Sequence, residues 1–151
     1  MPRAPFQILV LPYRETECGL EFAVFSRSDY ACRQGIAGGG EDYESPLKAT
    51  KRESFEEAGI PVDACFMPLQ ATCSVPVCNF EDGGAWEKSL YVISEYSFGV
   101  DCTNVQLVLS AEHEMFEWLS YEKAHARLTY DSNRTALWEL NLRLNGRGPR
   151  E

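Results

Sequence analysis

Three glutamates on one predicted helix face are the residues of this chain best suited to chemistry. Glu53, Glu56 and Glu57 are spaced i, i+3 and i+4, and steps of ~100° per residue place their carboxylates within roughly a 100° arc if the segment is helical. Like charges this close repel one another, so a helix selected only for stability would spread them or alternate them with lysines. Mg²⁺ and Mn²⁺ take hard oxygen ligands of this kind and leave positions for water and phosphates. The spacing therefore predicts a divalent metal site, and the alternative is a solvated acidic helix.

The helix that must carry these carboxylates is delimited by local signals. Ser45 can cap its first turn, Pro46 suits the first helical position, and Gly59, followed by Ile-Pro, stops it. We therefore predict a helix over residues 47–58. The face opposite the carboxylates is small and weakly apolar, as expected for close packing on a sheet; it consists of Leu47, Ser54 and Ala58.

The segment around this helix resembles the signature of the Nudix hydrolase family, in which a glycine and a glutamate precede an Arg-Glu pair, a Glu-Glu pair and a closing glycine. The matching positions are Gly38, Glu44, Arg52, Glu53, Glu56, Glu57, Gly59 and Ile60. Ser54 departs from the pattern, because the family usually has a larger aliphatic residue there. Since Ser54 faces away from the carboxylates, the departure concerns helix packing and leaves the metal chemistry intact.

The resemblance implies a fold and a catalytic set. The fold is of the α/β class, an α/β/α sandwich with a mixed central sheet. The implied metal ligands are Gly38, through its carbonyl, Glu53, Glu56, Glu57 and Glu112. The expected cofactor is Mg²⁺, with Mn²⁺ as a substitute, and water attacks phosphorus. The general base stays open among Glu56, Glu57 and Glu112, because neighbouring carboxylates titrate as a group.

Other residues around the signature have two interpretations each. Arg52 is the i, i+4 partner of Glu56, so we expect it to orient a carboxylate rather than to bind substrate. The candidates for substrate binding are Arg27, Arg33, Gly39 and Arg134, and for each arginine the alternative is a structural salt bridge. Gly38–Gly40 are expected to let the backbone turn sharply and approach a ligand. Aromatic residues that could stack on a base, or simply pack in the core, are Tyr30, Phe80, Trp86 and Tyr91. The histidines, His113 and His125, suggest nothing catalytic by themselves.

Hydrophobic patterning predicts strands around one central helix, with further helices at the end of the chain. The expected strands are 6–13, 20–27, 34–37, 63–77, 89–97, 105–109 and 114–119. A short helix capped by Ser120 should run to Ala126, and a longer one, capped by Asp131 or Ser132, to about Leu144. We expect residues 1–151 to form one domain.

Composition excludes several classes of protein. Hydrophobic residues make up 44% of the 151 residues, which is too apolar for a disordered chain. The net charge of −9 argues against binding of a nucleic acid polymer, because that affinity depends on Lys and Arg. The six scattered cysteines form no C-x-x-C pair, and with no secretory signal they predict reduced thiols in the cytoplasm. No apolar run is long enough to span a membrane. The expected partner is a small phosphorylated molecule, and a homodimer is possible.

Substrate identity rests on weaker resemblances. Segments including Glu112-His113, Trp118-Leu119 and Ser132-Asn133-Arg134 resemble the branch that cleaves dihydroneopterin triphosphate or dATP to a monophosphate and pyrophosphate. Pro76 lies where enzymes that cleave ADP-ribose have a proline, although an edge-strand proline is the simpler interpretation. A Nudix module that senses a nucleotide without hydrolysing it is an alternative of a different class.

Overall fold

The computed structural model describes residues 3–28, 31–80 and 86–150. The strands are β1 (Arg3–Thr16), β2 (Gly19–Arg27), β3 (Arg33–Gln34), β4 (Ile36–Glu41), β5 (Phe66–Pro76), β6 (Val92–Asp101) and β7 (His113–Leu119). The helices are α1 (Pro46–Ala58), α2 (Tyr121–Arg127) and α3 (Asp131–Leu144), and a short 3₁₀ turn, η1, covers Val77–Asn79.

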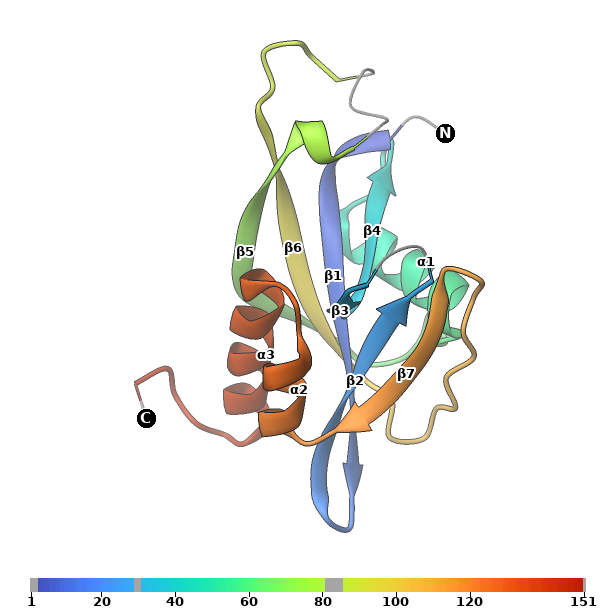
Figure 1. Ribbon diagram of the computed structural model, residues 1–151, viewed down its shortest axis with the longest axis vertical. Coiled ribbons are helices and arrows are strands. Elements are labelled where there is room, and N and C mark those ends of the chain that lie inside the picture. The colour runs from blue at the N-terminus through green and yellow to red at the C-terminus, as the bar shows by residue number, and fades with distance from the viewer. Residues whose placement is uncertain (1–2, 29–30, 81–85, 151) are drawn as a thin grey trace.

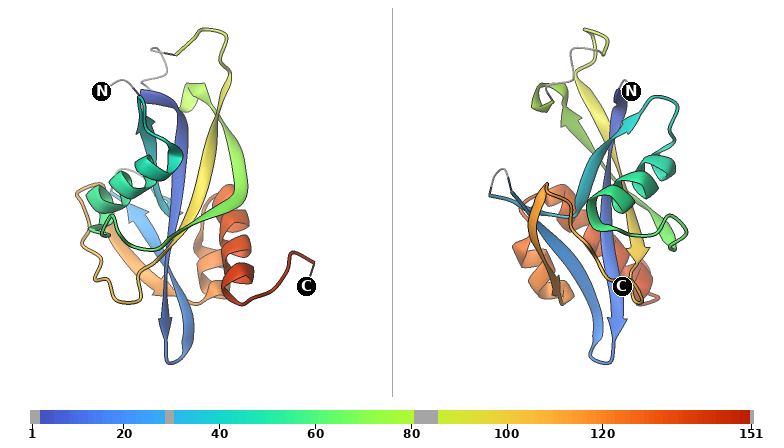
Figure 2. Two further views of the ribbon diagram at one scale, coloured as in Figure 1. Left: turned by 180° about the vertical axis from the view of Figure 1, so that it is seen from behind. Right: turned by 90° about the vertical axis from the view of Figure 1, so that its right-hand side faces the viewer.

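The strands form one mixed sheet between two helical layers. Within the described residues the path is β3-β2-β1-β6-β5, with β4 paired to β1 and β7 paired to β2. The β1–β6 pair is parallel and the other pairs are antiparallel. Helix α1 lies behind the sheet in Figure 1, whereas α2 and α3 lie in front of it, and the right-hand view of Figure 2 shows the same separation. The expected α/β/α sandwich with a mixed sheet is confirmed.

Strand β1 supplies both hydrophobic cores because its side chains alternate between the two faces. Ile8 and Val10 pack on the α1 side with Ala49 and Ala58. Leu9 and Leu11 pack on the other side against α3, where Leu137 and Leu140 are fully buried. A strand covered on both faces accounts for the almost continuous apolar run in this part of the sequence.

Helix α1 begins and ends close to the predicted positions. The Ser45 hydroxyl accepts a hydrogen bond from the Lys48 amide (3.2 Å), and Gly59 has a left-handed conformation with φ of 68°. Ser54 and Ala58 are buried against the sheet as expected, but Leu47 is 39% exposed. The expected position of Leu47 on the packing face is therefore wrong: it lies in the first turn, and the buried surface is completed by Ala49 and Thr50.

Four other expectations need correction. Gly38–Gly40 belong to β4 rather than to a sharp turn, and the turn follows at residues 42–43. Strand β6 is shifted towards the C-terminus of the predicted 89–97. Residues 105–109 form no strand, because the Val108 amide bonds the Ala58 carbonyl at the end of α1 (2.9 Å). The residue that caps α3 is Tyr130, which supplies no side-chain bond.

Two further observations concern the chain as a whole. None of the helices in the described ranges is long and apolar enough to cross a membrane. All six cysteines are free thiols.

Candidate active site

Strand β4 brings its backbone against the carboxylate of Glu53 because it carries glycine there. A Cβ on Gly38 would lie 2.7 Å from both Cγ and Oε2 of Glu53, so the Glu53 side chain would have to shift to make room for it. A Cβ on Gly39, on the opposite face of the strand, would lie 2.7 Å from Nε of Arg3. The glycines therefore serve close approach on both faces of β4, with no positive φ at either position.

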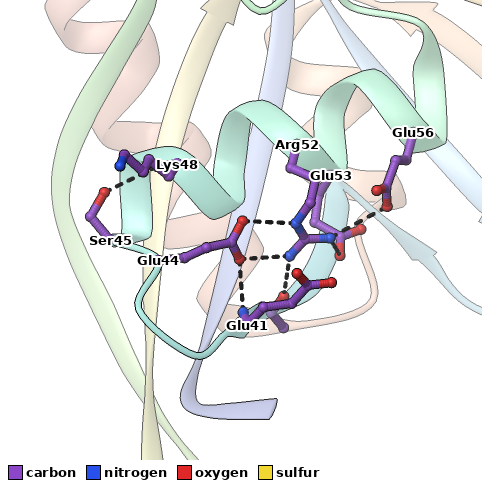
Figure 3. A network of polar contacts seen from close by, with 8 residues as sticks. Glu41, Glu44, Ser45, Lys48, Arg52, Glu53 and Glu56 are labelled. Carbon is purple, nitrogen blue, oxygen red and sulfur yellow. Dashed lines mark hydrogen bonds and ion pairs between the residues drawn. The ribbon is translucent and has the colours of Figure 1, made fainter. Parts of the chain in front are cut away.

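Arg52 holds the segment before α1 and the carboxylates of α1 together (Figure 3). Its Nε and Nη2 donate to the two oxygens of Glu44 at 2.8 and 2.9 Å. Its Nη2 also donates to the Gly39 carbonyl (2.9 Å), and Nη1 donates to Glu53 (2.9 Å) and Glu56 (3.4 Å). Glu44 in turn accepts the Glu41 amide at 2.7 Å. This bidentate, charge-assisted arrangement fixes the orientation of the carboxylates relative to the glycine strand.

The charges of this network are set by burial and by Arg52. Burial raises the pKa of Glu53 to about 7, against the opposing effect of Arg52, and the charges of Glu57 and Glu56 add to the rise. The hydrogen bond from Arg52 lowers the pKa of Glu44. Glu44 is thus the carboxylate neutralised by Arg52, whereas Glu53 is left in a site where a second cation would be favourable.

Glu57 lies deeper than its neighbours and has a histidine partner. Its Oε2 is 2.7 Å from Nε2 of His113, whose side chain is fully buried and packs on Phe25 with ring centroids 5.2 Å apart. Burial opposes ionisation of Glu57, but hydrogen bonds from His113 and Glu112 outweigh it and lower its pKa. The hydrogen bond between Glu57 and Glu112, together with burial, raises the pKa of Glu112. Glu112 is therefore the member of this pair that retains a proton more readily.

The chain before β7 is fastened so that Glu112 and His113 reach α1. The Ser110 amide bonds the Glu57 carbonyl (2.9 Å), which satisfies a terminal carbonyl of the helix. From the end of β2, the Ser28 amide and hydroxyl both bond the Glu112 carbonyl at 3.0 Å. Two segments distant in sequence, the end of α1 and the end of β2, thus fix the position of Glu112.

The candidate substrate-binding residues separate into two groups. Arg27 pairs with His113 in the β2–β7 ladder, and its charge lowers the pKa values of Glu57 and Glu112, so it lies beside the carboxylates. Gly39 also lies beside the carboxylates, because its carbonyl accepts a hydrogen bond from Arg52. Arg134 instead forms an ion pair with Asp131 and bonds the Leu128 carbonyl, the structural alternative considered from the sequence. The Arg33 backbone is tied to Thr129 in the α2–α3 connection.

A cleft of about 440 Å³ lies on the α3 side of the sheet, across β4 from Glu53. Its lining includes Leu9 and Ala37 of β1 and β4, Val75 of β5, and Phe80. Of the aromatic candidates, Phe80 lines the cleft, Tyr91 is exposed, Trp86 donates to the Arg3 carbonyl, and Tyr30 lies outside the described residues. A larger cavity of about 550 Å³, between β5 and the C-terminal half of α3, is not lined by the carboxylates.

The donor set suits a divalent cation of the magnesium type. It consists of carboxylate oxygens on one helix and one turn, without thiolate, and Glu53 has a raised pKa partly because of its like-charged neighbours. In the arrangement described, no three acidic, cysteine or histidine side chains among residues 3–28, 31–80 and 86–150 converge on one point. Glu53 and Glu56 point to Arg52, and Glu57 to His113, so binding of a cation requires these side chains to turn from their present partners.

Comparison with known proteins identifies the family. The NUDIX domain model matches residues 9–138. The chain belongs to the NUDIX family. A crystal structure from Listeria monocytogenes, described as that of a candidate NUDIX hydrolase, is 42% identical with a TM-score of 0.86 and covers 95% of this chain and 96% of its own. Comparison with curated proteins returned no match.

More distant NUDIX structures share the fold. The Escherichia coli dihydroneopterin triphosphate pyrophosphohydrolase has a TM-score of 0.73 at 24% identity, over 92% of this chain and 97% of that one. A Caenorhabditis elegans Ap4A hydrolase has a TM-score of 0.73 at 20% identity, over 95% and 99% of the two chains. The NUDIX protein described here is accordingly a hydrolase acting on phosphoric anhydride bonds, with a general pyrophosphohydrolase activity.

Sequence reasoning missed His113 as a partner of Glu57. The reason is a β-bulge: the β2–β7 ladder pairs Ser26 with Met115 and then Arg27 with His113, so Glu114 is the extra residue. The bulge directs His113 inward, where strict alternation along the strand would not place it. The pattern Glu-His-Glu before a strand was the available signal, but it does not specify which of the three residues turns towards α1.

Proposed function

We propose that this NUDIX protein is a metal-dependent pyrophosphohydrolase that cleaves a nucleoside triphosphate or a related compound, such as dATP or dihydroneopterin triphosphate, to a monophosphate and pyrophosphate. The observation that carries the proposal is the position of β4. Its glycines separate the carboxylates of α1 on one face from a cleft on the other face, which is lined by both polar and apolar side chains. A molecule with a phosphate chain at one end and a heterocycle at the other matches this arrangement.

The carboxylates are assigned to Mg²⁺, for which Mn²⁺ is the expected substitute. Glu53, Glu56, Glu57 and Glu112, with the Gly38 carbonyl, would hold the ion. Mg²⁺ bound there supplies Lewis acidity and screens the negative charge of the phosphates. The role of Arg52 is to position Glu53 and Glu56, since its guanidinium is engaged by Glu44 and the Gly39 carbonyl.

Proton transfer is assigned to the pair formed by Glu57 and Glu112. Glu57 has a lowered pKa and Glu112 a raised one, so one proton is shared unequally between two groups in hydrogen-bond contact. This sharing describes the metal-free pair; with the cation bound, whichever of Glu57 and Glu112 is not occupied as a ligand would accept the proton of the water that attacks phosphorus. We assign contact with a phosphate oxygen to Arg27, because its charge acts on both groups.

The choice of triphosphate rests on two supports. The segment from Glu112 to Ala136 resembles the dihydroneopterin triphosphate and dATP branch, and the E. coli pyrophosphohydrolase shares the fold over most of both chains. Cleavage between the α and β phosphates follows from this assignment. The alternative activity is cleavage of ADP-ribose or another nucleoside diphosphate derivative. Its support is Pro76, which lines the cleft at the end of β5.

A substrate panel with product analysis tests the proposal. The protein is incubated with Mg²⁺ and dATP, dGTP, neopterin-type triphosphates, ADP-ribose or diadenosine tetraphosphate in ¹⁸O-water, with EDTA as the metal-free control. We expect a labelled phosphate product, pyrophosphate from triphosphates, and no product in EDTA. AMP and ribose 5-phosphate at a higher kcat/KM than any triphosphate would overturn the substrate assignment. Nucleotide binding without hydrolysis of any compound would instead indicate a sensing module.

A further inference from the structure

The floor of the cleft contains a row of polar side chains fixed by strand register. Glu95 of β6 is paired with Gln7 of β1 on one side and with Cys73 of β5 on the other. All three residues line the cleft. Because paired residues point to the same face of a sheet, the row runs across the floor with Glu95 at its centre.

Glu95 is largely buried and has a weak partner in Cys73. The Cys73 thiol lies 3.5 Å from Oε1 of Glu95, and a thiol is a poor donor. Burial raises the pKa of Glu95, and burial together with the Glu95 charge raises the pKa of the Cys73 thiol to about 11. A carboxylate offers about four acceptor positions, so most of the hydrogen-bonding capacity of Glu95 is not used by the thiol.

Gln34 is a second polar group in the same cleft whose capacity is not used. It is only 5% exposed, and its side-chain nitrogen has no hydrogen-bond acceptor within the part of the chain that the structure describes. Nearby Asn133 is different: its oxygen accepts the Gly35 amide (2.9 Å) and its nitrogen donates to Ser132 (3.3 Å). A buried amide donor without an acceptor is costly, and a ligand acceptor would remove that cost.

The remaining lining indicates which part of a substrate enters. Leu9, Val75, Pro76 and Phe80 provide apolar surface, and the nearby Arg3 guanidinium is engaged by Gln7 and by the Phe80 ring, 4.6 Å from its centroid. Phosphate groups need cations, whereas a neutral ring with N–H and carbonyl groups suits apolar surface with a few convergent polar groups. The cleft is thus suited to a heterocycle.

We propose that Glu95 and Gln34 select a 2-amino-4-oxopyrimidine ring, the ring shared by guanine and pterins. Glu95 accepts hydrogen bonds from the ring N–H and the adjacent amino group, and Gln34 donates to the oxo group. Adenine lacks this pattern, because it presents a ring nitrogen lone pair to one Glu95 oxygen and an amino group in place of the oxo acceptor. The inference rests on the proposed function in so far as the cleft receives the base of the substrate, and of the two compounds named there it favours dihydroneopterin triphosphate over dATP.

Two perturbations of the same contact test the inference, one in the protein and one in the ligand. Glu95→Gln keeps the side-chain shape but replaces one acceptor by a donor. Inosine nucleotides keep the ring N–H and oxo group but lack the amino group. The matched control is Glu122→Gln, an exposed position on α2. Each protein is assayed for kcat/KM with dGTP, dATP and dITP in Mg²⁺, and for the Kd of GMP, AMP and IMP in EDTA.

The wild-type protein and the Glu122→Gln control should favour guanine over adenine and over hypoxanthine by about 10-fold or more, the discrimination that a well-placed bidentate contact gives. Glu95→Gln should lose most of both preferences. Equal treatment of the three bases by the wild-type protein, or an unchanged ratio in Glu95→Gln, overturns the inference. Neopterin triphosphate, compared with dGTP, decides which source of the ring is preferred.

The inference and the proposed function fail in different ways. Hydrolysis without base preference refutes the role of Glu95 and leaves the hydrolase intact. Selective GMP binding in EDTA that is lost in Glu95→Gln, without hydrolysis of any triphosphate, supports the role of Glu95 and refutes the proposed reaction. If Glu95→Gln does not fold, equal binding of GMP and IMP by the wild-type protein still overturns the inference, because that measurement requires no variant.

Discussion

Replacing His113 by phenylalanine should shift the pH dependence of catalysis, because it removes the donor that keeps Glu57 ionised. The ring volume against Phe25 is retained, while the 2.7 Å contact to the buried Glu57 carboxylate is lost. A hydrogen bond to a charged group contributes about 1.5–3 kcal/mol, and 1.36 kcal/mol corresponds to one pKa unit. The acid limb of kcat/KM should therefore move by about one to two pH units towards higher pH.

The same change has a defined effect on stability. The contact with His113 lowers the pKa of Glu57 below its ordinary value, so its contribution is present above the ordinary carboxyl pKa and is lost as the pH falls through the folded-state value. The free energy of unfolding of His113→Phe should be lower than that of the wild type by about 1–3 kcal/mol at pH 7. The two proteins should converge in acid.

The assay is a pH profile of kcat/KM on the best substrate of the panel, accompanied by urea unfolding in EDTA. His125→Phe is the matched control, because His125 of α2 packs on Tyr121 (ring centroids 5.7 Å apart) away from Glu57. The control should retain the wild-type profile. Superimposable profiles for His113→Phe and wild type would show that His113 does not set the ionisation of Glu57, and the argument from their contact would be wrong.

Three further predictions concern α1. Glu56→Gln and Glu57→Gln should each reduce kcat in Mg²⁺ by ~10²-fold or more with an unchanged circular dichroism spectrum; near wild-type turnover in both would refute the assigned role. Ser54→Leu should lower the free energy of unfolding by about 1–3 kcal/mol, because Ser54 is fully buried. Ser54→Ala should not lower it, because the Ser54 hydroxyl has no partner within the described residues. A loss of Mg²⁺ affinity in Ser54→Leu without destabilisation would show that the helix phase is wrong. The pKa of Glu53 is raised to about 7, so the folded state binds more protons than the unfolded state, and the free energy of unfolding in EDTA should fall from pH 5 to pH 7. Urea titrations should show a smaller fall with pH for Glu53→Gln than for the wild type. Parallel pH dependences of the two proteins would contradict the prediction.

The sequence predicted those parts of the molecule whose causes are local. Helix α1 was predicted because Ser45, Pro46 and Gly59 act within one turn of its ends. The acidic cluster was predicted because i, i+3 and i+4 spacing determines a helix face. Glu112 was expected in a turn before a strand, and it lies in one.

The features that the sequence did not predict depend on pairings between distant segments. Glycine is uncommon in strands, so Gly38–Gly40 indicated a turn; the side chains that require glycine there, Glu53, Arg3 and Phe6, come from other elements. Leu107 and its neighbours looked like a strand but cover the core beside the end of α1. The cleft row of Gln7, Glu95 and Cys73 exists only because β1, β6 and β5 adopt one particular register. None of these contacts leaves a periodic signal in the sequence.

The glycine strand also has a genetic consequence. At Gly38, Gly39 and Gly40 an added Cβ would collide with Glu53, Arg3 and Phe6 respectively, and every missense codon at a glycine position encodes a residue that has a Cβ. Every missense change at these three successive codons therefore forces Glu53, Arg3 or Phe6 to move. In a library that samples all substitutions, they should form a continuous block of depleted variants. Lys48, which is exposed on α1, should tolerate exchange far more widely.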